Sequence, residues 1–151
     1  IIHAMTPSER AKPDQIKAVA AGACEVALVN TYYYLRIARS TEAADKAIAE
    51  KVAIGFPDQA GDGTHVNISG GGIAANAPNR DNAVKFLQFL TSAKAQILFA
   101  TTNNEYPAVG EGAPALTDGP DVSFKAAKTA VTVFGKRQAE AQAIFDRVGW
   151  R

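Results

Sequence analysis

The sequence has little of what disulfide-bonded, metal-cluster and membrane-spanning proteins need. One cysteine and two histidines among 151 residues exclude an internal disulfide and a cysteine-clustered metal site, and they argue against a histidine-rich one. Sixteen Lys and Arg residues against fifteen Asp and Glu residues leave a net charge of +1, without the basic patch that binds nucleic acid or an anionic membrane surface. The longest apolar runs, such as Val26–Val29 and Ile97–Ala100, are too short for membrane insertion.

The composition that remains is that of a folded globular domain. Apolar residues make up 47% and charged residues 21% of the chain, both near the averages for such domains. A chain of this length buries about 70% of its unfolded surface when it folds. Ile1 is not an initiator methionine, and residues 1–5 do not have the pattern of a signal peptide. We therefore expect a processed chain or a piece of a longer one.

Apolar periodicity and turn signals predict helices interleaved with strands, which is an α/β fold. Six helices are expected, the fifth of them capped by Ser92: Pro13–Gly22, Thr31–Arg39, Glu42–Glu50, Pro78–Leu90, Ser92–Phe99 and Lys136–Val148. Three strands are expected, the first of them buried: Glu25–Asn30, Lys51–Ile54 and Thr64–Ser69. A polar loop at Pro57–Gly63 and an extended connector at Asn103–Pro120 complete the pattern.

Two of these helices have an apolar face, and in the last helix the pattern predicts that this face points inward. In the helix that follows Pro78 this face consists of Ala83, Phe86, Leu87 and Leu90. In the last helix it consists of Ala141, Ile144, Phe145 and Val148, and Gly149 is the expected stop signal.

The most unusual feature is a run of tyrosines, Tyr32–Tyr34, directly after Asn30-Thr31. Most such runs are aromatic packing, in which the ring is buried and the hydroxyl stays in water. The alternative is a hard-metal site, because phenolate is a strongly basic anionic oxygen and an acidic cation such as ferric iron can deprotonate it. Adjacent residues share one ion only at a turn or a helix start, and the change of direction at Asn30-Thr31 permits this.

Asn30 has two interpretations of its own. Its side chain can orient an anion in front of the backbone N–H groups of the helix start. The simpler interpretation is a plain helix N-cap, a role that asparagine commonly fills.

The remaining motifs give no positive case for an enzyme. Ser69-Gly70-Gly71-Gly72 lacks the lysine of a phosphate-binding loop, and the pattern favours a bend or a close backbone approach. Cys24 is expected to be a small buried hydrophobe, and His65 a surface or structural histidine. No Ser/His/Asp set or carboxylate pair follows from the spacing.

Several ordered blocks together resemble the ferric-ion-binding periplasmic proteins, which are the substrate-binding components of bacterial iron(III) ABC importers. The resemblance covers nearly the whole chain, and it includes the end of the sequence, Asp146–Arg151. The other blocks are Asp14–Gly22, Val26–Tyr34, Phe56–Gln59, Gly63–Gly70 and Asn104–Pro107.

The resemblance implies a type II periplasmic-binding-protein fold, in which two α/β lobes close on the ligand. Members of that family are about twice as long, so this chain corresponds to about the C-terminal half. Residues 1–66 and 118–151 are then expected in the tyrosine-bearing lobe and residues 67–117 in the other lobe, with Thr64–Ser69 crossing between them. The missing N-terminal half is expected as a partner, present as a separate chain.

The resemblance also implies the roles of individual residues. The family's adjacent tyrosine ligands fall on Tyr32 and Tyr33, and its anion-contacting asparagine falls on Asn30, while Tyr34 is extra. Further ligands come from the N-terminal half, and a synergistic anion, phosphate or carbonate, completes the sphere around Fe(III). The implied function is capture of ferric iron in the periplasm and delivery to an inner-membrane ABC permease, without catalysis.

Two other classes of function stay open. The same fold can bind a small organic solute such as a polyamine, a sugar or a thiamine-like cation, with Tyr32–Tyr34 as a stacking wall. An enzyme or regulatory domain that reuses the fold would need a catalytic set that the sequence does not offer.

Overall fold

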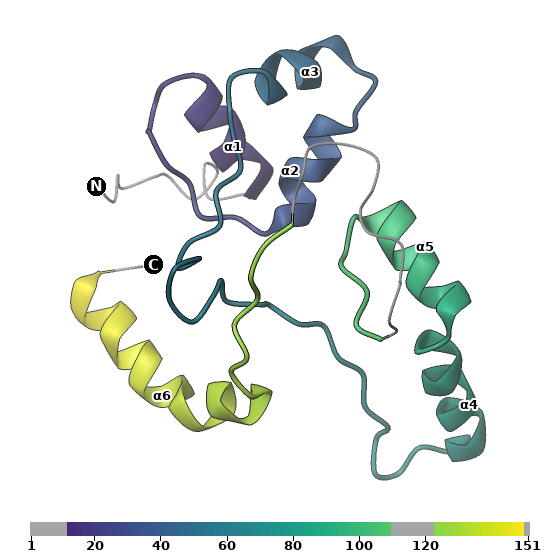
Figure 1. Ribbon diagram of the computed structural model, residues 1–151. Coiled ribbons are helices and arrows are strands. Elements are labelled where there is room, and N and C mark those ends of the chain that lie inside the picture. Colours follow the sequence, from purple (N-terminus) through teal and green to yellow (C-terminus); the bar gives the residue numbers. More distant parts are fainter. Residues whose placement is uncertain (1–11, 110–122, 150–151) are drawn as a thin grey trace. The chain divides into compact units, whose positions relative to one another are not determined.

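A computed structural model describes residues 12–109 and 123–149 of the chain. This part contains six α-helices (Figure 1), which are α1 (Lys12–Ala20), α2 (Thr31–Ala38), α3 (Ala43–Ala49), α4 (Arg80–Leu90), α5 (Ala93–Asn103) and α6 (Val131–Val148). In the described ranges no segment forms a β-strand, and the one isolated bridge joins Thr64 to Ala126 in parallel. No helix within the described residues is long and apolar enough to span a membrane.

The six predicted helices are confirmed, and local signals explain their ends. Gly22, with a φ of 76°, follows α1 and adopts a left-handed conformation that suits glycine. Ser92 caps α5, since its hydroxyl accepts a hydrogen bond from the Ala95 amide at 3.3 Å. The start of α6 lies five residues before the predicted start at Lys136. The helix runs through Gly135, because one glycine costs a helix only about 1 kcal/mol.

The three predicted strands are wrong as strands. Glu25–Asn30, Lys51–Ile54 and Thr64–Ser69 form no ladder within the described residues, apart from the single bridge at Thr64. The first of them is not buried either, because Val26 is 84% exposed and Leu28 is 78% exposed. A strand exists only through hydrogen bonds to a neighbouring strand. The apolar pattern of these segments is typical of buried strands, but the described residues contain no strand that could pair with them.

The best-packed part of the molecule is the cluster of α1, α2 and α3, which contact one another. Ile16 of α1 and Leu35 and Ile37 of α2 are buried there, and Leu35 is the most completely enclosed side chain. Burial of one such aliphatic side chain contributes about 2 kcal/mol. The cluster therefore gives α2 a fixed support.

A second small core lies in the helical pair α4 and α5. Ala95 and Ala100 are buried there, together with the polar side chain of Gln96. The Gln96 amide donates to the Leu90 carbonyl at 2.7 Å and accepts from the Ala108 amide at 2.7 Å. These bonds satisfy the buried polar group and tie the chain after α5 back onto the helix.

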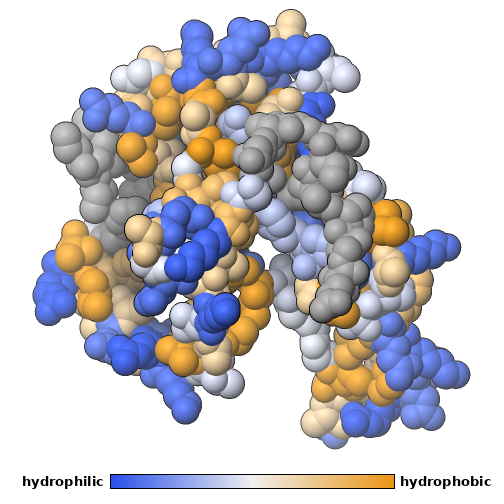
Figure 2. All heavy atoms as spheres, in the orientation of Figure 1, coloured by the Kyte–Doolittle hydropathy of each residue, from blue (hydrophilic) through white to orange (hydrophobic). Residues whose placement is uncertain are grey.

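The apolar face of α6 is exposed, whereas that of α4 is half-buried apart from Phe86. No residue of α4 or α6 is buried, and Phe86, Ile144, Phe145 and Val148 are each between 44% and 59% exposed. Figure 2 shows hydrophobic atoms at the surface over both α4 and α6. The prediction that the apolar face of α6 points inward is wrong for this chain, since Ala141, Ile144, Phe145 and Val148 are all exposed.

The described residues divide into two compact units. One holds the residues before Phe56 together with Asn67–Ser123, and the other holds Phe56–Val66 and the residues from Phe124 onward. The predicted division into lobes at residues 1–66, 67–117 and 118–151 stays a prediction, because two lobes are defined only in a complete fold. Residues 110–122, which include most of the predicted connector, lie outside the described part.

Candidate metal centre

The three predicted site residues lie together at the start of α2. Asn30 has extended backbone (φ −74°, ψ 144°) and the helix begins at Thr31, so the chain changes direction immediately before the tyrosines. The rings of Tyr32 and Tyr33 lie 4.3 Å apart between centroids and are tilted by 46°, and their side chains are hydrogen-bonded to each other. The Asn30 side-chain amide donates to the Tyr32 hydroxyl at 3.0 Å. Two phenol oxygens and one amide therefore converge on one place.

Asn30 is not the helix-capping side chain that the simpler interpretation predicted. It occupies the N-cap position of α2, but its side chain makes no capping hydrogen bond. The amide nitrogen is directed to Tyr32 instead. The Asn30 side chain, which at an N-cap would accept a hydrogen bond from a backbone amide of the helix, thus donates one to the Tyr32 phenol instead.

The electrostatic surroundings of Tyr33 oppose its ionisation. The pKa of Tyr33 is raised, chiefly by its side-chain hydrogen bond with Tyr32, then by partial desolvation and by the charge that Tyr32 would carry. The positive charge of Arg36 acts in the opposite direction and lowers this pKa. Two neighbouring phenols cannot both ionise near neutrality without a cation beside them. A cation bound by both oxygens would therefore have to displace the phenol protons.

The donor set at this place is phenolic rather than a cluster of imidazoles and carboxylates. Within residues 12–109 and 123–149, no three His, Cys, Asp or Glu side chains are grouped so that they could hold a metal ion. Hard anionic oxygens favour small, highly charged cations. Tyr34, the third member of the run, is half-buried on the same helix and lies outside the hydrogen bonds that join Asn30, Tyr32 and Tyr33.

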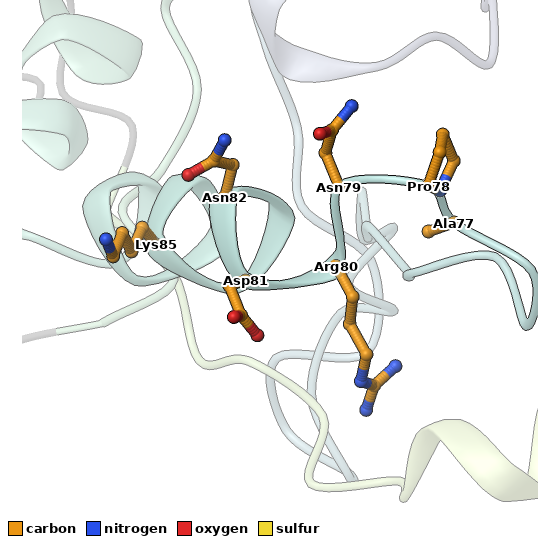
Figure 3. Close-up of a pocket in the computed structure, with 7 residues that line it drawn as sticks. All are labelled: Ala77, Pro78, Asn79, Arg80, Asp81, Asn82 and Lys85. Atoms are coloured by element: carbon orange, nitrogen blue, oxygen red, sulfur yellow. The ribbon is translucent and has the colours of Figure 1, made fainter.

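A hollow at the start of α4 does not form a second site. It is lined by one continuous stretch of chain, Ala77, Pro78, Asn79, Arg80, Asp81, Asn82 and Lys85. Figure 3 shows the side chains of Asn79 and Asn82 on one side of the backbone and those of Arg80 and Asp81 on the other. Because these groups point away from one another, they do not converge on a ligand.

The other sequence motifs have structural roles. A Cβ atom at Gly71 would lie 3.1 Å from the side-chain atom Leu87 Cδ2, whereas one at Gly70 or Gly72 would have no neighbour within 4 Å. The ring of His65 packs edge-on against Phe134, with centroids 5.0 Å apart. Cys24 is a half-buried free thiol. None of these residues joins the tyrosine pair.

Sequence reasoning missed Arg36, the charge that acts on Tyr33. Arg36 lies three residues after Tyr33 and four after Tyr32 in α2. This spacing places side chains on one helix face, so the sequence did contain the signal. A guanidinium beside phenols that must lose protons favours their ionised form.

Comparison with known proteins adds independent information. The sequence matches the family described as bacterial extracellular solute-binding protein over residues 4–97. It is 41% identical over 143 residues to Iron uptake protein A2 of Synechocystis sp., covering 91% of this chain and 40% of that protein.

Two solved structures are similar throughout most of the chain. The Trichodesmium protein FutA (IdiA), in complex with iron and citrate, has a TM-score of 0.78 and 47% identity, and the match covers 93% of this chain. The ferric binding protein of Campylobacter jejuni has a TM-score of 0.78 and 31% identity over the same share. In both cases the match covers 44% of the solved chain. This chain thus spans less than half the length of the proteins it matches, and it corresponds to about their C-terminal half.

Proposed function

Since the chain belongs to the family of bacterial extracellular solute-binding proteins, with about half of a type II periplasmic-binding-protein fold, we propose that it captures ferric iron. Tyr32 and Tyr33 are the ligands that this chain supplies, and Asn30 contacts the accompanying anion. The observation that carries the proposal is the hydrogen-bonded pair of phenols at the first turn of α2, with the Asn30 amide directed at it.

Phenolate oxygens suit ferric iron because they are hard and anionic, and iron in turn lowers the pKa of a bound phenol. A phenol loses its proton when it becomes a phenolate ligand, so binding through both oxygens releases two protons. Iron affinity therefore falls as the pH falls, by up to about a hundredfold per pH unit in the range where both phenols are protonated. Arg36 favours the deprotonated form of Tyr33, since its charge lowers the pKa of that phenol, although the other causes raise it more.

The site is completed by residues outside this chain. Two phenolates do not fill the coordination sphere of a ferric ion, and we propose that the N-terminal half of the protein provides the remaining protein ligands. The exposed apolar side chains of Val26 and Leu28, directly before the site, support this proposal because water is an unfavourable neighbour for them. An anion, phosphate or carbonate, occupies the place in front of Asn30.

The biological role that follows is transport without catalysis. We propose that the iron-loaded protein is periplasmic and delivers its ion to an inner-membrane ABC permease. Iron is then the cargo, and its release follows from opening of the lobes, since loss of either lobe's ligands leaves an incomplete sphere. The proteins matched above, described as iron uptake and ferric binding proteins, support this role.

The test is a titration with ferric citrate of the chain combined with the N-terminal part of the Synechocystis protein. Iron bound through tyrosinates gives a visible charge-transfer band. Tyr32→Phe and Tyr33→Phe each remove one phenolate and are expected to weaken the band and the affinity at least about a hundredfold, as removal of a strong metal ligand does. Tyr34→Phe is the matched control and is expected to change neither.

The titration also separates the competing functions. Binding of a polyamine, sugar or thiamine-like solute without colour, with iron bound weakly, would favour the organic-solute alternative. Equal colour and affinity in the wild type and in both ligand variants would overturn the tyrosine assignment. A band that persists unchanged as the pH falls would contradict the release of two protons.

A further inference from the structure

The chain passes between its two compact units at three places, and all three are tied together within one unit. The passages lie between residues 55 and 56, 66 and 67, and 123 and 124. Phe56 and Phe124, each the first residue after a passage, stack with centroids 4.5 Å apart and ring planes 12° from parallel. Close to the remaining passage, Thr64 is bridged to Ala126. We call Phe56–Val66 together with Phe124–Ala127 the crossing junction.

The bridge at the centre of the crossing junction is too short to hold by itself. It consists of two backbone hydrogen bonds, from the Thr64 amide to the Lys125 carbonyl at 2.8 Å and from the Ala127 amide to the Thr64 carbonyl at 2.9 Å. A sheet normally stabilises such bonds through the pairs on either side. Here one side chain takes the place of the missing ladder.

That side chain is Gln59. Its Nε2 donates to Thr64 Oγ1 at 2.8 Å, to the Lys125 carbonyl at 3.1 Å and to the Pro57 carbonyl at 3.3 Å. Its Oε1 accepts from the Lys125 amide at 2.7 Å. The Gln59 amide thus pairs with both backbone groups of Lys125, as a residue of a neighbouring strand would.

Two further contacts close the crossing junction around Gln59. Thr64 Oγ1, which accepts from Gln59, donates to the Pro57 carbonyl at 2.6 Å, and Lys125 Nζ donates to the Gly61 carbonyl. Gly63 is buried, and a Cβ atom there would lie 2.7 Å from the Lys125 carbonyl oxygen. The two backbones therefore approach as closely as glycine allows, and the pairing has one register.

From this arrangement we propose that Gln59 is a positioning residue, which fixes the register of the segments that lead from one unit to the other. Movement between the units then takes place at the three passages, before Phe56, beyond Val66 and before Phe124, while the crossing junction stays rigid. The role requires a neutral amide. A carboxylate at position 59 accepts from the Lys125 amide but faces the carbonyl oxygens of Pro57 and Lys125 without a proton to donate.

The proposal is tested by amide hydrogen exchange on the full 151-residue chain. The amides of Thr64 and Ala127 report on the bridge. Gln59→Leu is expected to speed their exchange roughly tenfold, the order expected when one or two net hydrogen bonds are lost, and Gln59→Glu is expected to do the same. Amides of α2 are expected to keep their rates in both variants.

Gln142→Leu is the matched control. Gln142 lies in the same unit, and its amide donates to Asp146 within α6 at 3.0 Å, so this variant makes the same chemical change away from the crossing junction. It is expected to leave the Thr64 and Ala127 amides unchanged. The proposal is overturned if Gln59→Leu leaves those two amides unchanged, or if it speeds exchange throughout the chain, because Gln59 would then be a general stabilising residue.

A second readout rests on the proposed function and uses the iron-loaded combination with the N-terminal part of the Synechocystis protein. Gln59→Leu is expected to change the rate of iron transfer to a chelator severalfold while the charge-transfer band keeps its wavelength, since no ligand is altered. An unchanged rate, or a shifted band, would contradict the positioning role. If the wild type forms no coloured complex, the proposed function fails, and the exchange experiment alone decides the role of Gln59.

Discussion

The α1–α3 cluster and the crossing junction are held together by different kinds of contact. The cluster buries the aliphatic side chains Ile16, Leu35 and Ile37, whereas the junction depends on hydrogen bonds of an exposed glutamine and on one aromatic stack. Buried apolar packing resists local opening, whereas exposed hydrogen bonds hold a segment only when several of them act together. Both parts are proposed to be fixed, the cluster as the support of the tyrosine pair and the junction where chain segments leave a unit.

The largest expected effect comes from removing the centre of the cluster. Leu35→Ala deletes a fully enclosed side chain and is expected to lower the free energy of unfolding by about 3 kcal/mol, through lost burial and the cavity left behind. Tyr32 and Tyr33 lie on the turn before Leu35 in the same helix, so iron binding is expected to weaken as well. Chemical denaturation followed by circular dichroism measures the loss.

Leu28→Ala makes the same chemical change at a side chain that is 78% exposed. In the chain alone it is expected to cost less than about 0.5 kcal/mol. In the combination with the N-terminal part, the cost is expected to rise to about 2 kcal/mol, because the side chain becomes buried there. Equal costs for the two variants in the chain alone would contradict the contrast between a packed and an unpacked surface.

The second-largest expected effect comes from a substitution that disrupts the crossing junction. Gly63 has a φ of 104°, and a Cβ atom there would meet backbone atoms of Lys125 and Ala126. Gly63→Ala is therefore expected to cost about 2 kcal/mol, from backbone strain and from displacement of the bridge. Hydrogen exchange at Thr64 and Ala127 is expected to lose its protection, while amides of α2 keep theirs.

Gly135→Ala is the control for this substitution. Gly135 lies within α6, and an added Cβ atom has no neighbour within 4 Å. Alanine is expected to stabilise that helix by up to about 1 kcal/mol. If Gly63→Ala were also neutral or stabilising, the close approach of the two backbones would not hold the junction.

The comparison also shows which features a sequence can reveal. Helices were predictable because their signals are local, such as Ser92 before α5 and the glycine that follows α6. The strands and the inward face of α6 were not, because their partners have to come from distant residues, and the described part of the chain does not contain them. The family comparison recovers the α/β fold, since the apolar pattern belongs to the complete protein.

For the functional residues too, some positions were predictable from the sequence and others were not. Asn30, Tyr32 and Tyr33 could be found because they lie within four residues of one another at a predicted change of direction, and the structure brings them together. Gln59 could not be found from spacing, because its partner Lys125 lies 66 residues away. A side-chain amide that replaces a strand leaves no periodic signal in the sequence.

The smallest expected effect concerns the residues that precede α5 and α2, and it tests whether Asn30 stabilises α2 as a helix cap. Ser92 caps α5 through its hydroxyl, so Ser92→Ala is expected to cost about 1 kcal/mol. Asn30 occupies the same position before α2 but makes no side-chain cap, so Asn30→Ala is expected to cost less than about 0.5 kcal/mol. Thermal denaturation of both variants measures this ranking, and the reverse ranking would show that Asn30 is a plain cap.

Because Asn30 contacts Tyr32 and, by our proposal, the anion, Asn30→Ala is expected to weaken iron binding at limiting phosphate or carbonate. A variant that lowers affinity without lowering stability is the result that separates a ligand-positioning amide from a structural one.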